Sequence, residues 1–418
     1  MKKRIIAVLL VLILAGNMSM SDLVAYAANV EVSTPFSVTK TEVTPEQEQS
    51  VSDNTPVQKQ EENENLADNE SWLDDEEQAE NEPDGDNVET DTDIDSDLEA
   101  EVLYSGKDGN LNWSIDADGL LTISGVGDYE GKNTEESFHK LPQWYEYRSD
   151  IRSAEVSVSG IKSTAYMFYG CENMVNVDLS QMDTRQVTDM SNLFYQCGSL
   201  TDVNLETLNT SQVVDMSWMF FCSGLTSLDL SGFDTSQVTD MRGMFDGCTE
   251  LTSLNIQGLD TSQVTDMSNM FYRCTKLTSL DLSNFDTSKV TDMGGIFYGC
   301  ESIKELDLSD FDTSQVTDMW GMFYGCTEMI SLDISQFDTH KVTGMESMFS
   351  DCKNIKELDL SGFNTSLVRD MRHMFNGCSS LEFLDVSSFD TRNVTDMEMM
   401  FDICGTKNYM ADPNMTLT

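Results

Sequence analysis

The sequence predicts an α/β repeat solenoid, in which short coils of one design stack side by side. Cysteine recurs ten times at intervals of 26 residues, with a single interval of 25, and no cysteine lies outside this series. Within each interval, a helix-like spacing of apolar residues alternates with a strand-like one. A fixed period of this length is the signature of a solenoid in which each unit contacts its neighbours.

The N-terminus has the features of an export signal. Three basic residues at 2–4 precede an apolar run at 5–15, and residues 25–27 (Ala-Tyr-Ala) form a small-x-small cleavage motif. The apolar run is too short to span a bilayer. We therefore predict a signal peptide over 1–27, and a mature protein that is secreted or retained at the cell surface without inserting into the membrane.

Residues 28–101 differ in composition from the rest of the chain. They contain 25 Asp and Glu against two lysines. Such a segment cannot bury enough apolar surface to offset its chain entropy, so we predict a disordered acidic stalk. Asp91, Asp93 and Asp95 resemble the start of a calcium loop, but the turn glycine is missing, and we favour a solvated charge run.

The next segment, 102–160, is predicted to be a β-rich capping module. Leu111, Trp113 and Ile115 alternate with polar residues, and after a turn at Asp118-Gly119 the alternation resumes in 120–124. This pattern is typical of a β-hairpin. A solenoid needs covered ends, so the hairpin would close the N-terminal side of the stack.

Residues 161–404 contain the coils. The apolar residues of one copy are Met241, Met244, Phe245 and Cys248. This spacing predicts one face of a short helix, with Thr239 or Asp240 as its N-cap and Gly247 at its end.

The second pattern in each coil is typical of a strand. The stretches "LTSLDL" at 277–282 and "IKELDL" at 303–308 place apolar residues on either side of a polar one, and "FDTS" at 285–288 follows as a turn. We expect the strands to stack into one parallel sheet. The tail, 405–418, shows no such strand, which suggests either truncation or a partial coil.

The cysteines occupy one position of the repeat. They are Cys171, Cys197, Cys222, Cys248, Cys274, Cys300, Cys326, Cys352, Cys378 and Cys404. In the short interval Phe220 precedes Cys222 by two residues instead of three, which places the lost residue between them. Thiols on adjacent helices would lie too far apart for disulfides, and three histidines are too few for a metal site. We favour small buried side chains that fill the core over disulfides or reactive thiols.

Acidic residues also recur in columns. The middle of the predicted strands carries Asp178, Asp229, Asp281, Asp307, Asp333, Asp359 and Asp385, with Asn204 and Asn255 completing the column. This column is either a candidate ligand face, with or without bridging cations, or a solvated face whose charges prevent aggregation, and we favour the solvated face. The turns carry Asp234, Asp260, Asp286, Asp312, Asp338 and Asp390. These we expect to accept hydrogen bonds from their own turn backbone.

The repeated phrase "FDTSQVTDMxxMFxGCxxLxSLDLSx", together with "GNLNWSIDADGLLTISGVGD" and "WYEYR" before it, resembles the bacterial BspA-type leucine-rich-repeat surface proteins. The likeness extends over about residues 102–404. It implies a leucine-rich-repeat-like, right-handed coil and a role in adhesion to host matrix or to other cells. Phe233 and Phe285 stand where the commoner leucine-rich pattern has asparagine.

These features favour a non-enzymatic adhesin that binds an extracellular protein or glycan, such as host matrix, through its solenoid face. The alternative is a structural surface protein that associates with itself edge to edge. No nucleophile, phosphate loop or histidine pair indicates an enzyme or a cofactor. The formal charge of −50 argues against binding to nucleic acid, which requires a basic surface.

Overall fold

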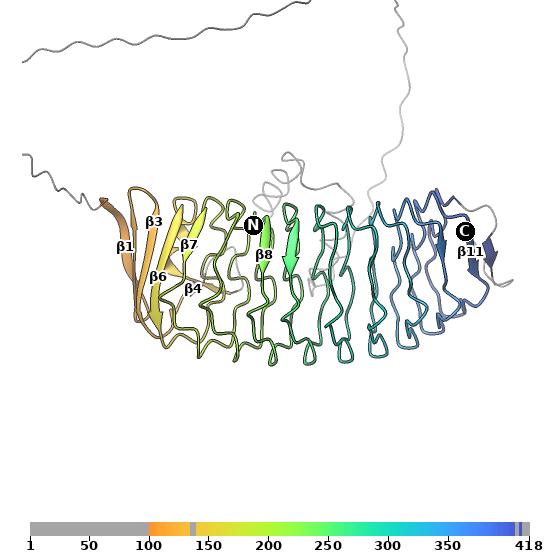
Figure 1. The fold of residues 1–418 in the computed structure, drawn as a ribbon, viewed down its shortest axis with the longest axis horizontal. Helices are drawn as coiled ribbons and strands as arrows, with labels where there is room; N and C mark the ends of the chain where they lie inside the picture. Colours follow the sequence, from red (N-terminus) through yellow and green to blue (C-terminus); the bar gives the residue numbers. More distant parts are fainter. Residues whose placement is uncertain (1–99, 134–138, 406–408, 412–418) are drawn as a thin grey trace, which may run out of the picture. The chain divides into compact units, whose positions relative to one another are not determined.

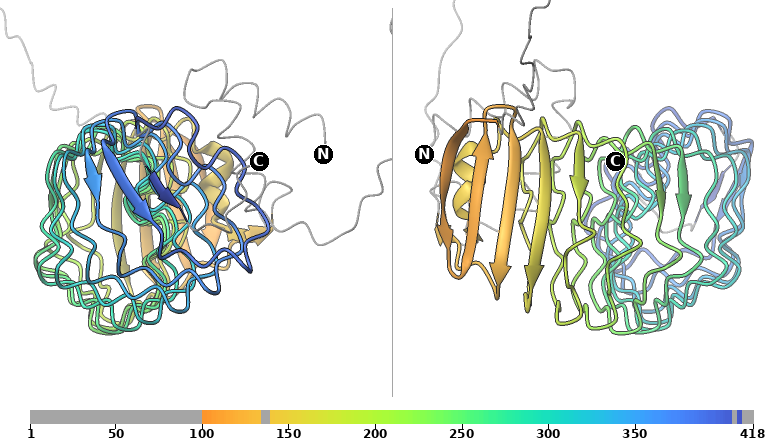
Figure 2. Two further views of the ribbon diagram at one scale, coloured as in Figure 1. Left: turned by 90° about the vertical axis from the view of Figure 1, so that its right-hand side faces the viewer. Right: turned by 60° about the vertical axis from the view of Figure 1, so that its left-hand side comes forward.

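A computed structural model describes residues 100–133, 139–405 and 409–411. The predicted signal peptide and nearly all of the predicted stalk lie outside these residues. Within the described residues, no helix has the length and apolar character needed to cross a bilayer. The described part is a stack of coils that follows a small N-terminal sheet, and the coils overlay one another when seen end-on (Figures 1 and 2).

The N-terminal sheet has the strand order β1-β2-β3-β6-β7. Its strands are β1 (Val102–Asp108), β2 (Leu111–Asp116), β3 (Leu120–Val126), β6 (Ser153–Ser159) and β7 (Asn176–Asp178). The predicted hairpin is confirmed, because β2 and β3 pair antiparallel with Ile115 opposite Leu121. β3 then pairs parallel with β6, and β6 with β7, which belongs to the first coil.

A short segment between β3 and β6 covers the inner side of this sheet. It contains β4 (Lys132–Asn133), β5 (Lys140–Leu141) and a 3₁₀ helix, η1 (Gln143–Tyr147). Trp144 of η1 is fully buried, and its indole Nε1 donates to the carbonyl of Met167, 2.8 Å away in the first coil. The module is thus joined to the solenoid, and its role as a cap remains a prediction.

The strands of the coils are shorter and less continuous than predicted. They are β8 (Ser227–Asp229), β9 (Ser253–Asn255), β10 (Glu357–Leu358), β11 (Phe383–Val386) and β12 (Tyr409–Ala411). β8 pairs with β9, and β10, β11 and β12 form a separate sheet, so the single parallel sheet is wrong. The stretches 277–282 and 303–308 contain no assigned strand.

The gap between these sheets coincides with uninterrupted charge. β8 and β9 place Asp229 beside Asn255, whereas the coils from Asp281 to Asp333 place aspartate beside aspartate. Charge alone does not account for this gap, because β10 and β11 pair directly before Asp359 and Asp385, and the coil of Asn204 has no strand. β12 corrects a second expectation, because the segment after Cys404 does contain a strand, paired parallel to β11. The hand of the coil remains a prediction.

The prediction of a short helix between the turn and the cysteine of each coil is wrong. In the copy at 241–248 the backbone forms consecutive turns, in which Met244 N–H donates to the Met241 carbonyl and Cys248 N–H to the Phe245 carbonyl. Every second N–H group instead donates a hydrogen bond to the next coil. That of Phe245, for example, donates to the Met270 carbonyl of the next coil at 2.9 Å.

Left-handed backbone explains why no helix forms. The third and seventh residues after the recurring "TD" aspartate have positive φ, as at Gly243 (φ 58) and Gly247 (φ 74). Two such residues per turn segment prevent a right-handed helix. The inward spacing of i, i+3, i+4 and i+7 is nevertheless met, because the turns also point these side chains to the core. Asp240 is therefore not a helix N-cap.

A stack of phenylalanine rings, one from each coil, runs through the middle of the core. The stacked rings are Phe168, Phe194, Phe220, Phe245, Phe271, Phe297, Phe323, Phe349, Phe375 and Phe401. Neighbouring centroids lie 5.5–5.9 Å apart and the ring planes agree within 15°. Methionines, leucines and valines surround this stack and are almost fully buried.

A buried threonine in each "FDTS" turn joins consecutive coils. These threonines are Thr184, Thr210, Thr235, Thr261, Thr287, Thr313, Thr339 and Thr365, and each is at most 2% exposed. Thr261 Oγ1 donates to the Asp286 carbonyl at 3.0 Å and accepts the Asp286 N–H at 2.8 Å. One hydroxyl thus satisfies both backbone groups of a residue in the next coil, which a valine of the same shape would not do.

The cysteines all lie in the described part of the chain, remain thiols, and in eight of ten cases are buried. A typical thiol, Cys274 Sγ, donates to the Phe245 carbonyl of the preceding coil at 3.3 Å. Burial raises the pKa of the Cys171, Cys248 and Cys300 thiols to about 12. These thiols fill narrow sites beside the phenylalanine stack.

Cys222 departs from this pattern and corrects the expected register. Ser223, 4% exposed, takes the core position, and its N–H donates to the Phe220 carbonyl as cysteine does in other coils. Cys222 instead takes the outer position that Gly247 holds in the next coil, with φ 49. The missing residue therefore lies between Ser223 and Leu225, and not before the cysteine.

Replacing Phe271 with alanine should destabilise the solenoid by about 3–5 kcal/mol, because it removes one ring from the middle of the stack and leaves a cavity. Urea or thermal unfolding would measure this change. Phe383→Ala is the matched control, since that ring is 51% exposed. A comparable loss for both variants would contradict the stacked core.

Thiol labelling of the folded protein should reach Cys222 and Cys404 at most, because the other eight thiols are buried. After unfolding in denaturant, all ten should react. Mass spectrometry after alkylation with a bulky maleimide would count the labelled residues. Rapid labelling of all ten in the native protein would show that the coils do not share this core.

Candidate ligand-binding faces

The strand face is the column of seven aspartates from Asp178 to Asp385 that the sequence predicted as a candidate ligand face. Six are exposed and Asp385 is half-buried. Each carboxylate accepts a hydrogen bond from the N–H of the serine two residues later, as Asp281 Oδ1 does from Ser283 at 3.1 Å. Asn204 and Asn255 make the same bond in their coils. The carboxylates thus have a fixed orientation that a neutral amide reproduces.

Hydrogen bonding also keeps the strand face charged. The Ser283 hydroxyl and N–H lower the pKa of Asp281, and the equivalent serines lower the pKa of Asp229, Asp307 and Asp333. At neutral pH the face therefore carries a row of negative charges. Among the described residues, no group of three His, Cys, Asp or Glu side chains has an arrangement suited to a metal ion.

The turn aspartates behave as the sequence predicted. Asp234, Asp260, Asp286, Asp312, Asp338 and Asp390 each accept the N–H two residues later. At Asp390 the Arg392 side chain adds a bidentate contact, which lowers the pKa of the carboxyl to about 2. Asn209 and Asn364 replace aspartate in this column and make the same bond.

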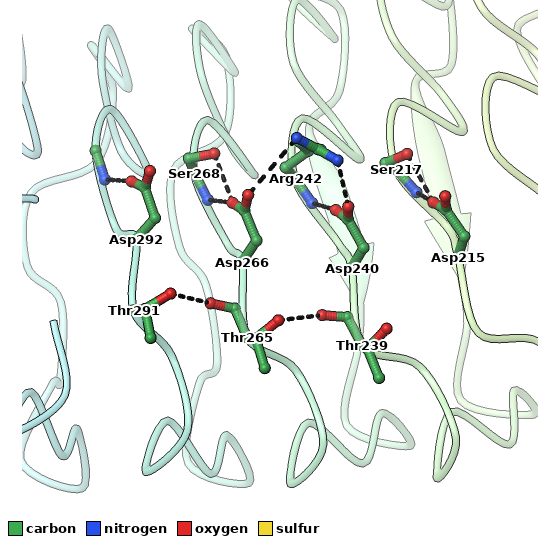
Figure 3. A network of polar contacts seen from close by, with 11 residues as sticks. Asp215, Ser217, Thr239, Asp240, Arg242, Thr265, Asp266, Ser268, Thr291 and Asp292 are labelled. Atoms are coloured by element: carbon green, nitrogen blue, oxygen red, sulfur yellow. Dashed lines mark hydrogen bonds and ion pairs between the residues drawn. The ribbon is translucent and has the colours of Figure 1, made fainter. Parts of the chain in front are cut away.

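A third acidic column, here called the bridge ladder, was missed by sequence reasoning. Its members are Asp189, Asp215, Asp240, Asp266, Asp292, Asp318, Asp370 and Asp396, with Gly344 in one coil. Consecutive members form isolated parallel β-bridges. Each carboxylate accepts the N–H two residues on, and in Figure 3 the carboxylates from Asp215 to Asp292 project to the same side. The recurring "VTD" triplet could have indicated this column.

Threonines next to the ladder reinforce it. Thr265 Oγ1 donates to the Thr239 carbonyl at 3.1 Å, and Thr291 Oγ1 donates to the Thr265 carbonyl at the same distance (Figure 3). This row of threonine side-chain hydrogen bonds runs parallel to the backbone bridges. It holds neighbouring coils at one spacing and brings the carboxylates close together.

Two arginines neutralise parts of the ladder. Arg242 contacts Asp240 at 2.6 Å and Asp266 at 3.8 Å (Figure 3). Arg372 contacts Asp370 at 3.0 Å, and also pairs with Glu346 and Asp396. Between these two clusters lie Asp292 and Asp318, where the residues two positions later are Gly294 and Trp320.

The central part of the ladder has unusual acidity. Burial, followed by the charges of Asp266 and Asp318, raises the pKa of Asp292 to about 6. Burial likewise raises the pKa of Asp318 and Asp240. The centre of the ladder and the strand face therefore differ chemically, because burial raises the pKa of Asp292 and Asp318 whereas serine hydrogen bonds lower the pKa of aspartates such as Asp281.

An aromatic column follows the phenylalanine stack on the outside of the coils, and it was also missed by sequence reasoning. Tyr169, Tyr195 and Phe221 stack at 4.5 and 4.2 Å, and Tyr272, Tyr298 and Tyr324 stack at 4.3 and 4.2 Å. Asp246 separates the two groups. The recurring "FY" dipeptide was the available signal, since the residue after an inward phenylalanine points outward.

Comparison with known families identifies the repeats. The model for "Mycoplasma protein of unknown function, DUF285" matches residues 133–252, 221–331, 247–356 and 295–412, which together cover more than half of the chain. The chain belongs to this family. No curated protein matches the sequence.

Solved structures give weaker likenesses. A leucine-rich repeat protein from Eubacterium ventriosum is 16% identical with a TM-score of 0.35, covering 74% of this chain and 96% of that one. A leucine rich cell surface protein from Faecalibacterium prausnitzii is 14% identical with a TM-score of 0.31, covering 74% and 94%. At these values the likenesses say nothing about ligands.

Asp292→Asn should stabilise the protein at pH 7.5 by about 1–3 kcal/mol, because the folded pKa lies above the usual value and the charged form is therefore disfavoured in the fold. Asparagine still accepts the Gly294 N–H. The gain should shrink as the pH falls through about 6 and vanish near pH 4, where the wild-type carboxyl is protonated. Thermal melts across this range would measure it.

Asp333→Asn is the matched control, since it makes the same change at an exposed carboxyl whose pKa is lowered. It should give no gain at pH 7.5. Equal stabilisation by both substitutions would indicate relief of general charge repulsion and not burial of Asp292.

Proposed function

We propose that this chain is a secreted or surface-retained, non-enzymatic interaction protein that binds an extracellular protein or glycan along its strand face. The observation that carries the proposal is the repetition of one chemical group at one place in coil after coil. A row of fixed carboxylates can engage an extended partner at several points together, so weak single contacts add. The predicted signal peptide and the resemblance to BspA-type surface proteins support export.

The electrostatics of the strand face favour a partner with basic groups. The serine hydrogen bonds keep the carboxylates ionised and hold their orientation before binding. A preorganised row of anions loses little conformational entropy on binding and attracts Lys and Arg side chains at long range. The same surface would repel sulfated or sialylated glycans.

Self-association is the second candidate. β1 stands at one end of its sheet and carries Val102 and Leu103, exposed by 56% and 53%. β12 stands at the end of the last described sheet. Such strands can pair with another copy through their outer edges, which would build a structural layer without a dedicated ligand.

The triple substitution Asp281→Asn, Asp307→Asn and Asp333→Asn tests the strand face. Asparagine keeps the turn hydrogen bond, as Asn255 shows, and removes only the charge. Binding to a panel of matrix proteins, measured by surface plasmon resonance, should weaken about tenfold or more for any partner the wild type holds. The weakening should shrink as salt is raised.

The control is the triple substitution Asp260→Asn, Asp286→Asn and Asp312→Asn in the turns, which removes the same charge from another column. It should change affinity far less. Equal effects from both triples would show that net charge, and not the strand face, governs binding. Concentration-dependent assembly in light scattering, without any saturable partner, would favour the self-associating alternative.

A further inference from the structure

Trp320 is a large aromatic residue at a repeat position, two residues after the bridge-ladder aspartate, where the coil does not require one. The equivalent position in other coils holds serine, arginine, glutamate or glycine. The half-buried indole lies back over the preceding coil, where a Cβ on Gly294 would come within 2.2 Å of Trp320 Nε1. A Cβ on Gly295 would lie 3.3 Å from the six-membered ring. Only the glycine pair lets the indole lie against the backbone.

Tyrosines extend this aromatic surface. The Tyr298 ring lies 6.1 Å from Trp320, tilted by 53°, and stacks between Tyr272 and Tyr324. Gly321 makes room for Tyr298, since a Cβ there would lie 3.0 Å from the ring. The half-buried indole therefore packs against a tyrosine that is itself buried within a stack from three consecutive coils.

Hydrogen-bond acceptors border the same surface. Asp292 and Asp318 are the two ladder members next to the glycine pair and the tryptophan, and their Oδ1 atoms accept the N–H of Gly294 and Trp320, each at 2.9 Å. Each carboxylate retains further lone pairs. A platform with a flat apolar ring and adjacent acceptors is thus formed by residues of two coils.

A second indole lies over a glycine at the neighbouring position of the repeat. Trp218 lies over the following coil, where a Cβ on Gly243 would be 2.2 Å from the ring. Trp218 covers the coil of Gly243 and Trp320 covers the coil of Gly294, so the two platforms are two coils apart, roughly 10 Å at strand spacing. This separation is about the length of a disaccharide.

We propose that Trp320, Asp292 and Asp318 form a subsite for a neutral sugar of an extracellular glycan, with the buried Tyr298 supporting the indole, and that Trp218 forms a second subsite for the same chain. The C–H face of a pyranose stacks on the indole, and its hydroxyls donate to the carboxylates. A proline-rich peptide, which also stacks on indoles, has carbonyl acceptors and no N–H donors to offer these carboxylates. The net charge of −50 disfavours anionic glycans.

These residues lie in a different segment of each coil from the strand face. The inference therefore goes beyond the proposed function and does not depend on it. If the strand-face triple variant no longer binds a protein partner and Trp320→Ala still binds it, the proposed function alone is supported. If Trp320→Ala no longer binds a glycan and the strand-face triple variant still binds it, the sugar subsite alone is supported.

The test uses the full-length protein and calorimetric titration with chitotetraose, cellotetraose and α-mannotetraose, with sialyllactose as the anionic probe and a decaproline peptide as the competing class. At least one neutral tetrasaccharide should bind, and sialyllactose and the peptide should not. Trp320→Ala should reduce the affinity at least tenfold. Gly294→Val should act similarly, because it displaces the indole without removing it.

Phe383→Ala is the control, since it removes an exposed ring from the strand segment and should leave binding unchanged. Asp318→Asn, which still accepts the Trp320 N–H, should weaken sugar binding without lowering the melting temperature, since burial already disfavours the charged carboxylate. It separates the subsite from any loss of folding in the glycine variant. Binding of none of the neutral sugars, binding of the peptide alone, or affinity unaffected by both Trp320→Ala and Asp318→Asn would overturn the proposal.

Discussion

The hydrogen bonds between consecutive coils are the constraint on which the rest of this structure depends. In the turn segments, alternate N–H groups donate to carbonyls about 25 residues later, and the threonine hydroxyls add a further bond per coil. Because every coil is held to the next at the same positions, each side chain lies beside its equivalent in the neighbouring coil. The columns of phenylalanine, threonine and aspartate follow from this registry, and the 26-residue period is its expression in the sequence.

This registry has an electrostatic cost, since an acidic residue in the repeat becomes a row of like charges. Three features of the molecule reduce this repulsion between like charges. Exposed aspartates bond to their own turn and stay solvated, asparagine interrupts the strand column at Asn204 and Asn255, and Arg242 and Arg372 bridge members of the bridge ladder. Where none of these applies, around Asp292, burial raises the carboxyl pKa instead.

The sequence was sufficient for the features that depend on a single coil. The period, the β2–β3 hairpin, the inward residues and the turn aspartates were all predictable. The helix was wrong because the i, i+3, i+4, i+7 spacing also fits consecutive turns, and the glycines at 243 and 247 were the contrary signal. The position of Cys222 was misplaced because the alignment on cysteine assumed that Cys222 fills the core position, which Ser223 takes instead. Features that depend on two coils, such as the indole of Trp320 over Gly294, cannot be read from one repeat.

The distinction between repeated and exceptional residues also bears on where function resides. A residue that recurs in every coil, such as Thr261 or Phe271, is explained by the stacking it makes possible, and its repetition requires no ligand. The strand aspartates belong partly to this group, since their serine bonds shape each turn. The indoles of Trp218 and Trp320 are not required by the coil, because other coils fold with serine, arginine or asparagine at these positions. Both indoles are half-buried against glycines of a neighbouring coil, and the part of each ring that stays in contact with water is the surface that the proposed sugar subsites would use.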